Sequence, residues 1–517
     1  MRLPFNTLDQ RRLIDMAAST FAWWLKPIST TRTSKQEVEE PLSLATCLFH
    51  MPRLNCCIVA VTGFNTAINV DVVKEGLNQT VVKHPRISSK LVFDPKNPGR
   101  PIGWIRTKVD VNNHIIVPNL DYSNMDSPDE FVKDYVSNLA QTPMDLTKPL
   151  WEIHILNIKT KDANSIAVFR IHHSIGDGIS IISLILSCTR KTSDPNAVPT
   201  LPTENKKLVN TRSSFSLWDY FLWLLFAFNM LWNTFIDVCM FLATIVFLKD
   251  TKTHLKGSSG TEKAPKKFVY RILSLDDIKL VKNIMNVTIN DVVLGITQAG
   301  LSRYLNRKYC ESKGDEGVQK NNLPKHICIR SSIPINVRPT SKLQDLAEQM
   351  ETDDPNTKKW EWGNAIGHIF LPFHIALRED PLDYIRSAKA TIGKKKHSLE
   401  AIVTYICAEI VLKFLGLGVA AAITYRVLSN TTLGFSNMVG PMEEISFYGH
   451  PITFLATSVS GHPHALTIHF QSYMDKMTLV IAVDQNVIPD PQQLCDDIAE
   501  SLGLVKKAAQ KKKIFKI

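Results

Sequence analysis

The sequence predicts a mixed α/β (α+β) protein, and three observations support this class. Short apolar runs alternate with turn signals from Pro41 to about Arg190, and several runs are rich in β-branched and aromatic residues, as strands are. Residues 71–84 instead place their apolar side chains at helical spacing. With 517 residues, of which 44% are hydrophobic and 21% charged, the chain is long enough for several cores and too apolar for general disorder.

The first part of the chain contains both kinds of element. Strands are expected at residues 56–64, 150–156 and 165–171, and helices at 71–84, 127–141 and 179–187. The helix at 127–141 carries Asp129 and Glu130 in its first turn, where the helix dipole favours acidic groups. Residues 41–190 are therefore expected to form an N-terminal lobe, preceded by a polar, basic leader at residues 1–40.

A long apolar segment, Tyr220–Leu248, lies within a linker that spans residues 191–267. It has one charged residue, Asp237, and is long enough to cross a bilayer. Asn229, Asn233 and Asp237 recur every four residues and form a polar stripe, which a freely lipid-exposed span would not favour. An interfacial helix, a span whose stripe meets protein and an ordinary buried helix all remain open, and membrane association is the expectation.

Residues 268–505 are expected to form a C-terminal lobe, and residues 506–517 a basic tail with six lysines. Ser274 with Asp277, and Thr288 with Asp291, are spaced as reciprocal caps of two helices. Residues 383–426 are predicted to be largely helical. Strands are expected at residues 327–335, 431–436, 453–459, 466–473 and 477–484.

Charge and cysteine usage limit the partners and the compartment. The net charge of +11 favours an anionic partner, but the lysines gather in the tail rather than alternating with aromatic residues, so a nucleic-acid partner is not expected. The nine cysteines include no C-x-x-C pair. This usage is typical of reduced cysteines in a cytosolic or cytosol-facing protein.

The motif His172-His173-Ser-Ile-Gly-Asp177-Gly178 is the most specific local feature. It follows a predicted strand and precedes an apolar helix, a junction that can hold a side chain rigidly in a cleft. Because neighbouring side chains on an extended segment point in opposite directions, one histidine can face the cleft and the other the interior. Two glycines in three residues allow unusual backbone angles and close approach of a ligand.

The H-H-x-x-x-D-G pattern resembles the active-site motif of the CoA-dependent acyltransferase superfamily. The wider sequence, over about residues 40–505, resembles the plant branch of the wax ester synthase/diacylglycerol acyltransferase family. The other elements that carry the resemblance are Pro41-Leu42-Ser43, Pro143-Met144-Asp145, Pro149-Leu150-Trp151-Glu152, Asn290-Asp291-Val292, Phe435-Ser436-Asn437 with Gly440-Pro441, and Ile468-His469 through Asp484. Leu44 replaces the family's usual second proline.

This resemblance implies two similar lobes with the active site in a tunnel between them. It implies that His173 is the general base, that no covalent acyl-enzyme forms, and that acyl-CoA is a substrate rather than a bound cofactor. Asp177 would hold the loop through an ion pair, and Gly178 would leave space for the acyl chain or the pantetheine. His172 is expected to support the motif, and its replacement is expected to affect stability more than chemistry.

Four further residues remain open between scaffold and active-site roles. Asp291 is explained by its helix cap alone, whereas the Asn290 amide could also act near the cleft. Ser436 and Asn437 could line the tunnel or close a turn. His462, His464 and His469 resemble a metal set, but no cysteine or carboxylate completes a site, so alternation along strands is preferred and no metal is expected.

The resemblance implies an O-acyltransferase that moves a fatty acyl group from acyl-CoA to a long-chain alcohol, to diacylglycerol, or to both. Two alternatives remain: a non-catalytic, membrane-bound lipid-binding protein, and an acyltransferase for a non-lipid secondary metabolite. The second is disfavoured because the D-F-G-W-G element of those enzymes is missing. Because acyl-CoA is cytosolic and the products dissolve in membrane, the expected location is the endoplasmic reticulum membrane, or also the cell membrane, with the lobes in the cytosol.

Overall fold

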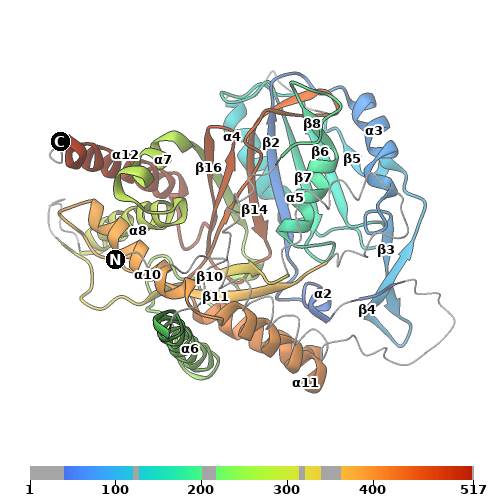
Figure 1. Ribbon diagram of the computed structural model, residues 1–517. Helices are drawn as coiled ribbons and strands as arrows, with labels where there is room; N and C mark the ends of the chain where they lie inside the picture. Colours follow the sequence, from blue (N-terminus) through green and yellow to red (C-terminus); the bar gives the residue numbers. More distant parts are fainter. Residues whose placement is uncertain are drawn as a thin grey trace.

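The computed structural model describes residues 40–42, 44–119, 127–200, 217–313, 321–338 and 363–514. In these ranges the strands form three sheets, two large and one small, and helices cover the large sheets from outside (Figure 1). The expected leader at residues 1–40 lies outside the described ranges except for Glu40. Residues 201–216 of the expected linker also lie outside them.

The seven-stranded sheet is the centre of the N-terminal lobe. Its strand order is β5-β6-β7-β2-β14-β13-β8. The strands are β2 (Cys57–Phe64), β5 (Ile115–Ile116), β6 (Trp151–Leu156), β7 (Ser165–His172), β8 (Thr189–Lys191), β13 (Ile445–Phe447) and β14 (His450–Ser460). The last two come from the C-terminal part of the chain, an exchange that the sequence-based division into lobes does not anticipate. β14 pairs antiparallel with β2 along its length.

Alternation along β2 explains how this sheet is covered on both faces. Ile58 and Ala60 pack in one apolar cluster with α3 (Val70–Gln79) and α5 (Gly178–Ser187). Val59 and Val61 point the other way and pack with α4 (Pro128–Leu139). Every residue of β2 is buried, as expected for a strand between two layers.

Short elements complete the N-terminal lobe. A three-stranded sheet of order β1-β4-β3 lies at its edge (Figure 1) and joins β1 (Glu40–Pro41), β3 (Ser89–Asp94) and β4 (Asn97–Arg106). The remaining pieces are α2 (Leu44–Leu48) and two 3₁₀ turns, η1 (Val81–Lys83) and η2 (Val111–Asn113).

The six-stranded sheet is the centre of the C-terminal lobe, with the order β11-β10-β12-β15-β16-β9. Its strands are β9 (Lys266–Ser274), β10 (Ile329–Asn336), β11 (Ile366–Phe373), β12 (Leu433–Met438), β15 (Leu466–Tyr473) and β16 (Lys476–Asp484). Its helices are α7 (Leu275–Met285), α8 (Ile289–Lys313), α10 (Leu382–Lys396) and α12 (Pro491–Ile514), with a 3₁₀ turn η4 (Thr261–Lys263) before β9. Thr288 and Asp291 cap each other as expected, whereas the other pair makes one of the two expected contacts: the Ser274 Oγ accepts from the Asp277 N–H at 3.2 Å, and the Asp277 carboxylate pairs with Lys506.

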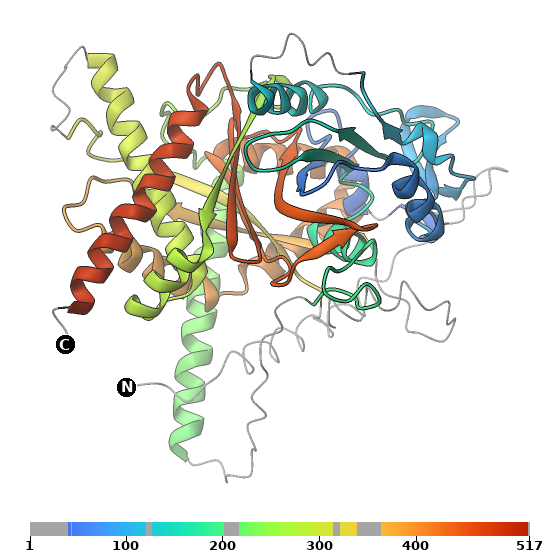
Figure 2. The same ribbon diagram turned by 90° about the horizontal axis from the view of Figure 1, so that it is seen from above.

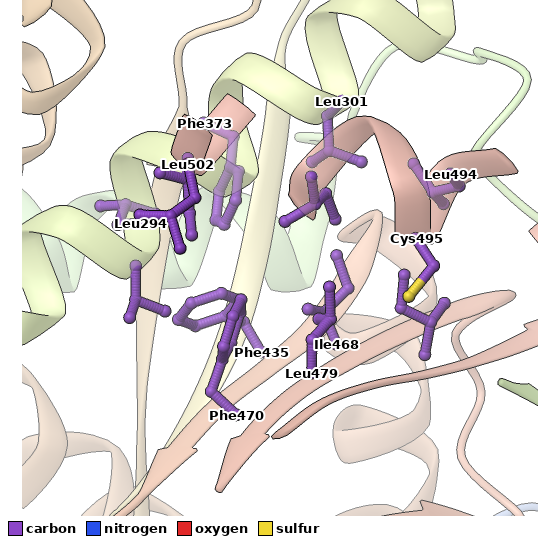
Figure 3. Packing of buried hydrophobic residues seen from close by; sticks show 14 of the residues in the cluster. Leu294, Leu301, Phe373, Phe435, Ile468, Phe470, Leu479, Leu494, Cys495 and Leu502 are labelled. Carbon is purple, nitrogen blue, oxygen red and sulfur yellow. The ribbon is translucent and has the colours of Figure 1, made fainter. Parts of the chain in front are cut away.

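The main core of this lobe lies between the sheet and helices α8 and α12. Figure 3 shows Phe435, Ile468, Phe470 and Leu479 on the strands facing Leu294, Leu301, Leu494 and Leu502 on the helices. The helix α12 extends through most of the expected basic tail, as far as Ile514. Its lysine-rich end therefore continues a helix whose first turns are anchored in this core.

Two long apolar helices lie together on one side of the body. They are α6 (Leu217–Val246) and α11 (Glu400–Asn430), which contact each other along part of their lengths, and α6 projects from the body in Figure 2. Both are long and apolar enough to cross a membrane by length and composition. The apolar segment expected at 220–248 is therefore one of two such helices, since α11 meets the same criteria of length and composition. Small polar and charged residues at its start and a break at Gly416 (φ 83°) made it less conspicuous.

The polar stripe on α6 meets protein at its charged end. The Asp237 carboxylate lies 2.8 Å from the Lys395 ammonium, which is also 2.7 Å from the carboxylate of Glu400 at the start of α11. Further along α6, Thr244 is fully buried and its hydroxyl accepts from Arg330. Asn229, at the other end of the stripe, is exposed. Polar contacts thus fix the second half of α6 to the body, whereas the first half contacts it through the Phe226 ring, which lies against His397, and through the buried Met230.

Candidate active site

The two histidines of the motif point in different directions, as alternation along the strand predicts. His172 ends β7 and is buried, with its Nδ1 2.6 Å from the Ser174 Oγ and its Nε2 2.7 Å from the Asn55 Oδ1. His173 follows the strand and lines a pocket between the lobes. Because both nitrogens of His172 are occupied within the protein, only His173 has a ring nitrogen available to a ligand.

Two neighbours hold the His173 imidazole in place. The Phe49 ring stacks on it, with centroids 4.2 Å apart and planes 16° from parallel. Asn364, which comes from the segment before β11, contacts both the ring and the backbone of His173. The orientation of the ring is therefore set by packing on one side and by hydrogen bonding on the other.

The contacts of Asn364 also determine where His173 carries its proton. The Asn364 Nδ2 lies 3.0 Å from the His173 carbonyl, which can only accept, so the amide group donates there. The Asn364 Oδ1 is thereby turned toward the His173 Nδ1, at 3.2 Å, and must accept from it. The proton is on Nδ1, and the lone pair on Nε2 is free to take a proton from a ligand.

Burial in this pocket lowers the pKa of His173 below its ordinary value of 6.5, although Asp177 and Asn364 oppose the shift. A base must be neutral to accept a proton, so a lowered pKa keeps His173 competent at and below pH 6.5. We expect kcat/KM to be flat around neutral pH and to fall only as the pH drops through the lowered pKa. A pH profile of kcat/KM measures this, and an acid limb with its midpoint above 6.5 would contradict it.

Asp177 has the ion pair that the resemblance implies. Its Oδ2 is 2.7 Å from the Arg338 Nη1, and both side chains are buried. Its Oδ1 accepts from the Ser180 N–H at 3.1 Å and so caps helix α5. Asp177 also accepts from the backbone N–H of Ala365 at 3.3 Å, next to Asn364. Asp177 therefore ties the histidine loop to the segment that positions His173, and all its contacts are structural.

Gly178 begins helix α5 beside the side chain of Met438. A Cβ at this position would lie 3.0 Å from the Met438 Cε, which is the flexible end of that side chain. The space that the missing side chain leaves is therefore used by Met438 in this structure. An acyl chain or pantetheine at this position stays a prediction.

The Asn290–Asn437 pair and Asp291 lie away from the pocket lining. The Asp291 carboxylate is buried and accepts from the Thr288 N–H at 2.7 Å, which is the capping role. The exposed Asn290 accepts from the Asn437 Nδ2 at 2.6 Å and so joins α8 to β12. Of the residues left open between scaffold and site, Ser436 is the one that lines the pocket.

The pocket lies between the two lobes and encloses about 1170 Å³ of space, including its open mouth. One wall is the inner face of α11, which contributes Thr404, Ala408, Leu412 and Leu428. Other walls come from α2, β10, β11, β12 and β15. The surface exposed inside the pocket is mainly apolar although polar side chains are frequent in its lining, and none of the described lining residues is a lysine or arginine.

Glu409 is the one acidic side chain among the described lining residues. Its spacing from Lys413 on α11 is that of a helical ion pair, but no such pair forms between the two in the structure, where the Lys413 ammonium lies over the Phe414 ring. The inner face of α11 thus directs a carboxyl group into the pocket, while Lys413 faces the exterior.

Three further histidines face the pocket and form no metal site with the described residues. His368, His462 and His469 line it, and burial lowers their pKa values to about 4, 3 and 4. Each is hydrogen bonded through Nδ1, His368 to Ser332, His462 to His464 and His469 to Ser458. In the described ranges no group of three or more histidine, cysteine or acidic residues is arranged to hold a metal ion.

Sequence reasoning missed the partners of the motif. Phe49, Asn364 and Arg338 contact His173 or Asp177 but lie 124, 191 and 161 residues away, outside any recognisable motif. The sequence offered one weak signal, since a buried aspartate in a glycine-rich loop requires a cation. Only the fold identifies which arginine supplies it.

Comparison with known proteins agrees with this geometry. Residues 50–230 match the model of the wax ester synthase/diacylglycerol acyltransferase catalytic domain, and residues 362–506 match the model of the WS/DGAT C-terminal domain. The chain is 48% identical to wax ester synthase/diacylglycerol acyltransferase 5 of Arabidopsis thaliana, over 94% of this chain and 96% of that protein. It is also 48% identical to wax ester synthase/diacylglycerol acyltransferase 4 of the same plant, over 93% of each.

Solved structures show the same fold at low sequence identity. The wax ester synthase/diacylglycerol acyltransferase from Marinobacter aquaeolei VT8 superimposes with a TM-score of 0.56 at 17% identity, over 91% of this chain and all of that one. The first condensation domain of the CDA synthetase gives 0.53 at 12% identity, over 93% and 97%. The expected mixed α/β fold with two lobes is thus confirmed. With the relatives above, this shows that the chain belongs to the wax ester synthase/diacylglycerol acyltransferase family and is an acyltransferase of that type.

Proposed function

We propose that this enzyme transfers a fatty acyl group from acyl-CoA to a long-chain alcohol or to diacylglycerol, with His173 as the general base. The observation that carries the proposal is the free Nε2 lone pair of His173 at the wall of a pocket whose surface is mainly apolar. A base of this kind can take the hydroxyl proton while the oxygen attacks a thioester carbonyl.

The transfer proceeds as a direct attack of the alcohol on the thioester, through a tetrahedral intermediate. The alcohol oxygen forms the ester C–O bond, its proton moves to the His173 Nε2, the C–S bond breaks, and the same proton passes to the departing CoA thiolate. Asn364 accepts from the Nδ1–H throughout and keeps the ring oriented. Both substrates occupy one pocket, so proximity replaces a covalent acyl-enzyme.

A direct assay separates this function from its alternatives. Purified protein is given palmitoyl-CoA with hexadecan-1-ol, with diacylglycerol, or with both in competition, and free CoA is measured. Release of CoA that depends on the alcohol supports transfer, and the competition gives the preferred acceptor. Binding of acyl-CoA without release would instead indicate a lipid-binding protein.

We also propose that α6 and the outer face of α11 dock the enzyme on the cytosolic face of the endoplasmic reticulum membrane. Exposed apolar side chains cover most of α6, among them Leu224, Phe228, Leu231 and Phe235, and Phe414 and Leu415 are exposed on α11. The lobes on either side of α6 in the sequence form one body, so a helix that lies in the interface accounts for α6 better than a single span. The lysine-rich end of α12 would add attraction to an anionic leaflet.

Replacing Leu224, Phe228, Leu231 and Phe235 together with glutamine should move the protein from the membrane to the soluble fraction. These side chains are 58%, 68%, 61% and 61% exposed, so their loss removes docking surface without opening the core. Flotation with microsomes measures the change. The matched control places glutamine at exposed apolar residues elsewhere, Val72, Val117, Leu146 and Leu504, and should still float.

Unchanged flotation of the α6 variant would contradict docking by this helix. The orientation has its own test, because the sequons at Asn78 and Asn286 lie on exposed residues and would be glycosylated in the lumen. The sequon at Asn430 is unsuitable, since its side chain is buried and donates to the Thr244 carbonyl. Glycosylation at Asn78 or Asn286 would place the lobes in the lumen of the endoplasmic reticulum and would contradict the proposed cytosolic orientation.

A further inference from the structure

A chain of three side chains runs from the end of α11 to the pocket. The Thr431 Oγ1 lies 2.9 Å from the Leu428 carbonyl and 2.8 Å from the His464 Nε2. The His464 Nδ1 lies 2.8 Å from the His462 Nδ1. Thr431 and His464 are buried, whereas His462 lines the pocket. The pocket wall is thus connected to a hydrogen-bonded chain behind it.

The direction of each hydrogen bond in this chain follows from its inner end. The Leu428 carbonyl can only accept, so the Thr431 hydroxyl donates to it and offers a lone pair to His464. His464 therefore carries its proton on Nε2 and accepts on Nδ1, which requires His462 to donate from its own Nδ1. The proton of the neutral His462 ring is fixed on Nδ1, and its Nε2 is a lone pair with no partner among the described residues.

A second lone pair in the pocket can accept from a second donor on a ligand. The reacting hydroxyl has one proton, and the base His173 takes it. The acyl chain has no donor, whereas the pantetheine arm of CoA has amide and hydroxyl donors and is the competing ligand, which the KM for palmitoyl-CoA distinguishes. The phosphates of CoA do not suit a pocket wall with Glu409 and without lysine or arginine. An alcohol acceptor with a further hydroxyl group has one donor for each of these two histidines, which line the same pocket.

We propose that His462 binds a second hydroxyl of the acceptor, so that the enzyme prefers diols, and glycerol lipids that keep a free second hydroxyl, over simple alcohols. This inference rests on the proposed acyl transfer. The reaction itself is unchanged: one hydroxyl forms the ester and loses its proton through His173 to the CoA thiolate, and the second hydroxyl stays intact. His462 is a binding residue, and His464 and Thr431 are positioning residues.

The experiment measures kcat/KM for hexadecan-1-ol and for hexadecanediols with hydroxyls on carbons 1 and 2, 1 and 3, or 1 and 4, at saturating palmitoyl-CoA. In the wild-type enzyme the best diol should exceed the simple alcohol by roughly 2- to 10-fold, the value of one neutral hydrogen bond. His462→Phe should reduce this ratio to about one. Thr431→Val should reduce it as well, because His464 then keeps only the Leu428 carbonyl of the two acceptors that hold its proton on Nε2.

The control is Thr297→Val, which removes a hydroxyl that is equally buried and also bonded to a helix carbonyl, in α8. It should leave the ratio unchanged, and thermal unfolding of all variants checks that they fold. A wild-type enzyme with no diol preference, or a preference that survives in His462→Phe, would overturn the proposal. A raised KM for palmitoyl-CoA with either acceptor would also overturn it, since His462 would then bind pantetheine. Failure of the proposed acyl transfer would give a different result from failure of the His462 proposal, because neither the simple alcohol nor any diol would then cause release of CoA.

Discussion

Replacing His173 with alanine should lower kcat by roughly 100- to 10,000-fold while the protein remains folded. The variant loses the Nε2 lone pair that we assign to proton removal, and only a half-buried ring beside Phe49 is lost from the packing. Steady-state release of CoA measures the rate, and thermal unfolding checks the fold. Binding of acyl-CoA should persist, because the pocket walls are unchanged.

The control for this variant is His450→Ala. His450 is a histidine outside the pocket lining that contacts Thr66 and the Asn69 N–H, and its loss should leave the rate unchanged. His172→Ala gives a second contrast, because His172 bonds Ser174 and Asn55 within the core and its loss should reduce stability more than chemistry. Near wild-type turnover by His173→Ala would eliminate the general-base mechanism.

Asp177→Asn should destabilise the enzyme by roughly 3–5 kcal/mol, because it leaves the Arg338 guanidinium buried without its counter-charge. The asparagine side chain can still cap α5 through its oxygen, so the loss is mainly electrostatic. We expect a lower midpoint of unfolding. The molecules that remain folded should keep most of their activity, since His173 keeps its own contacts with Phe49 and Asn364.

Asp110→Asn is the matched control, because Asp110 caps the 3₁₀ turn η2 in the same way but is exposed and has no buried cation. It should cost little stability. Denaturant unfolding compares the two variants, and turnover is measured at a temperature where both are folded. Wild-type stability with lost turnover in Asp177→Asn would mean that this carboxylate takes part in the chemistry.

Local features of the fold could be predicted because they depend on neighbours in the sequence. Burial of β2 and β7, the caps at Ser274 and Thr288, and the opposite directions of His172 and His173 all follow from periodicity and short-range hydrogen bonding. The family resemblance added the two-lobe architecture, which residue spacing alone did not provide.

Features that depend on distant contacts could not be predicted. The tautomer of His173 is set by Asn364, and that of His462 by a chain that ends at Thr431. Neither contact leaves a pattern in the sequence, because any of many amide or hydroxyl side chains could have supplied it. The sequence predicts that residues 383–426 are largely helical, but it does not predict that apolar side chains of α11 are exposed. Exposure depends on how the helix packs and not on its composition.

The pairing of β14 with β2 has a consequence for how the protein is made. On the ribosome, β2 emerges early, but the strand that covers its free edge ends at Ser460, about 400 residues later. At about 5 to 20 residues per second, that edge stays open for tens of seconds. An uncovered strand edge is a template for aggregation, so the nascent chain depends on chaperones or on delayed collapse during this interval. Nonsense mutations between β12 and β14 would leave the edge open permanently, and their products should be insoluble rather than merely inactive.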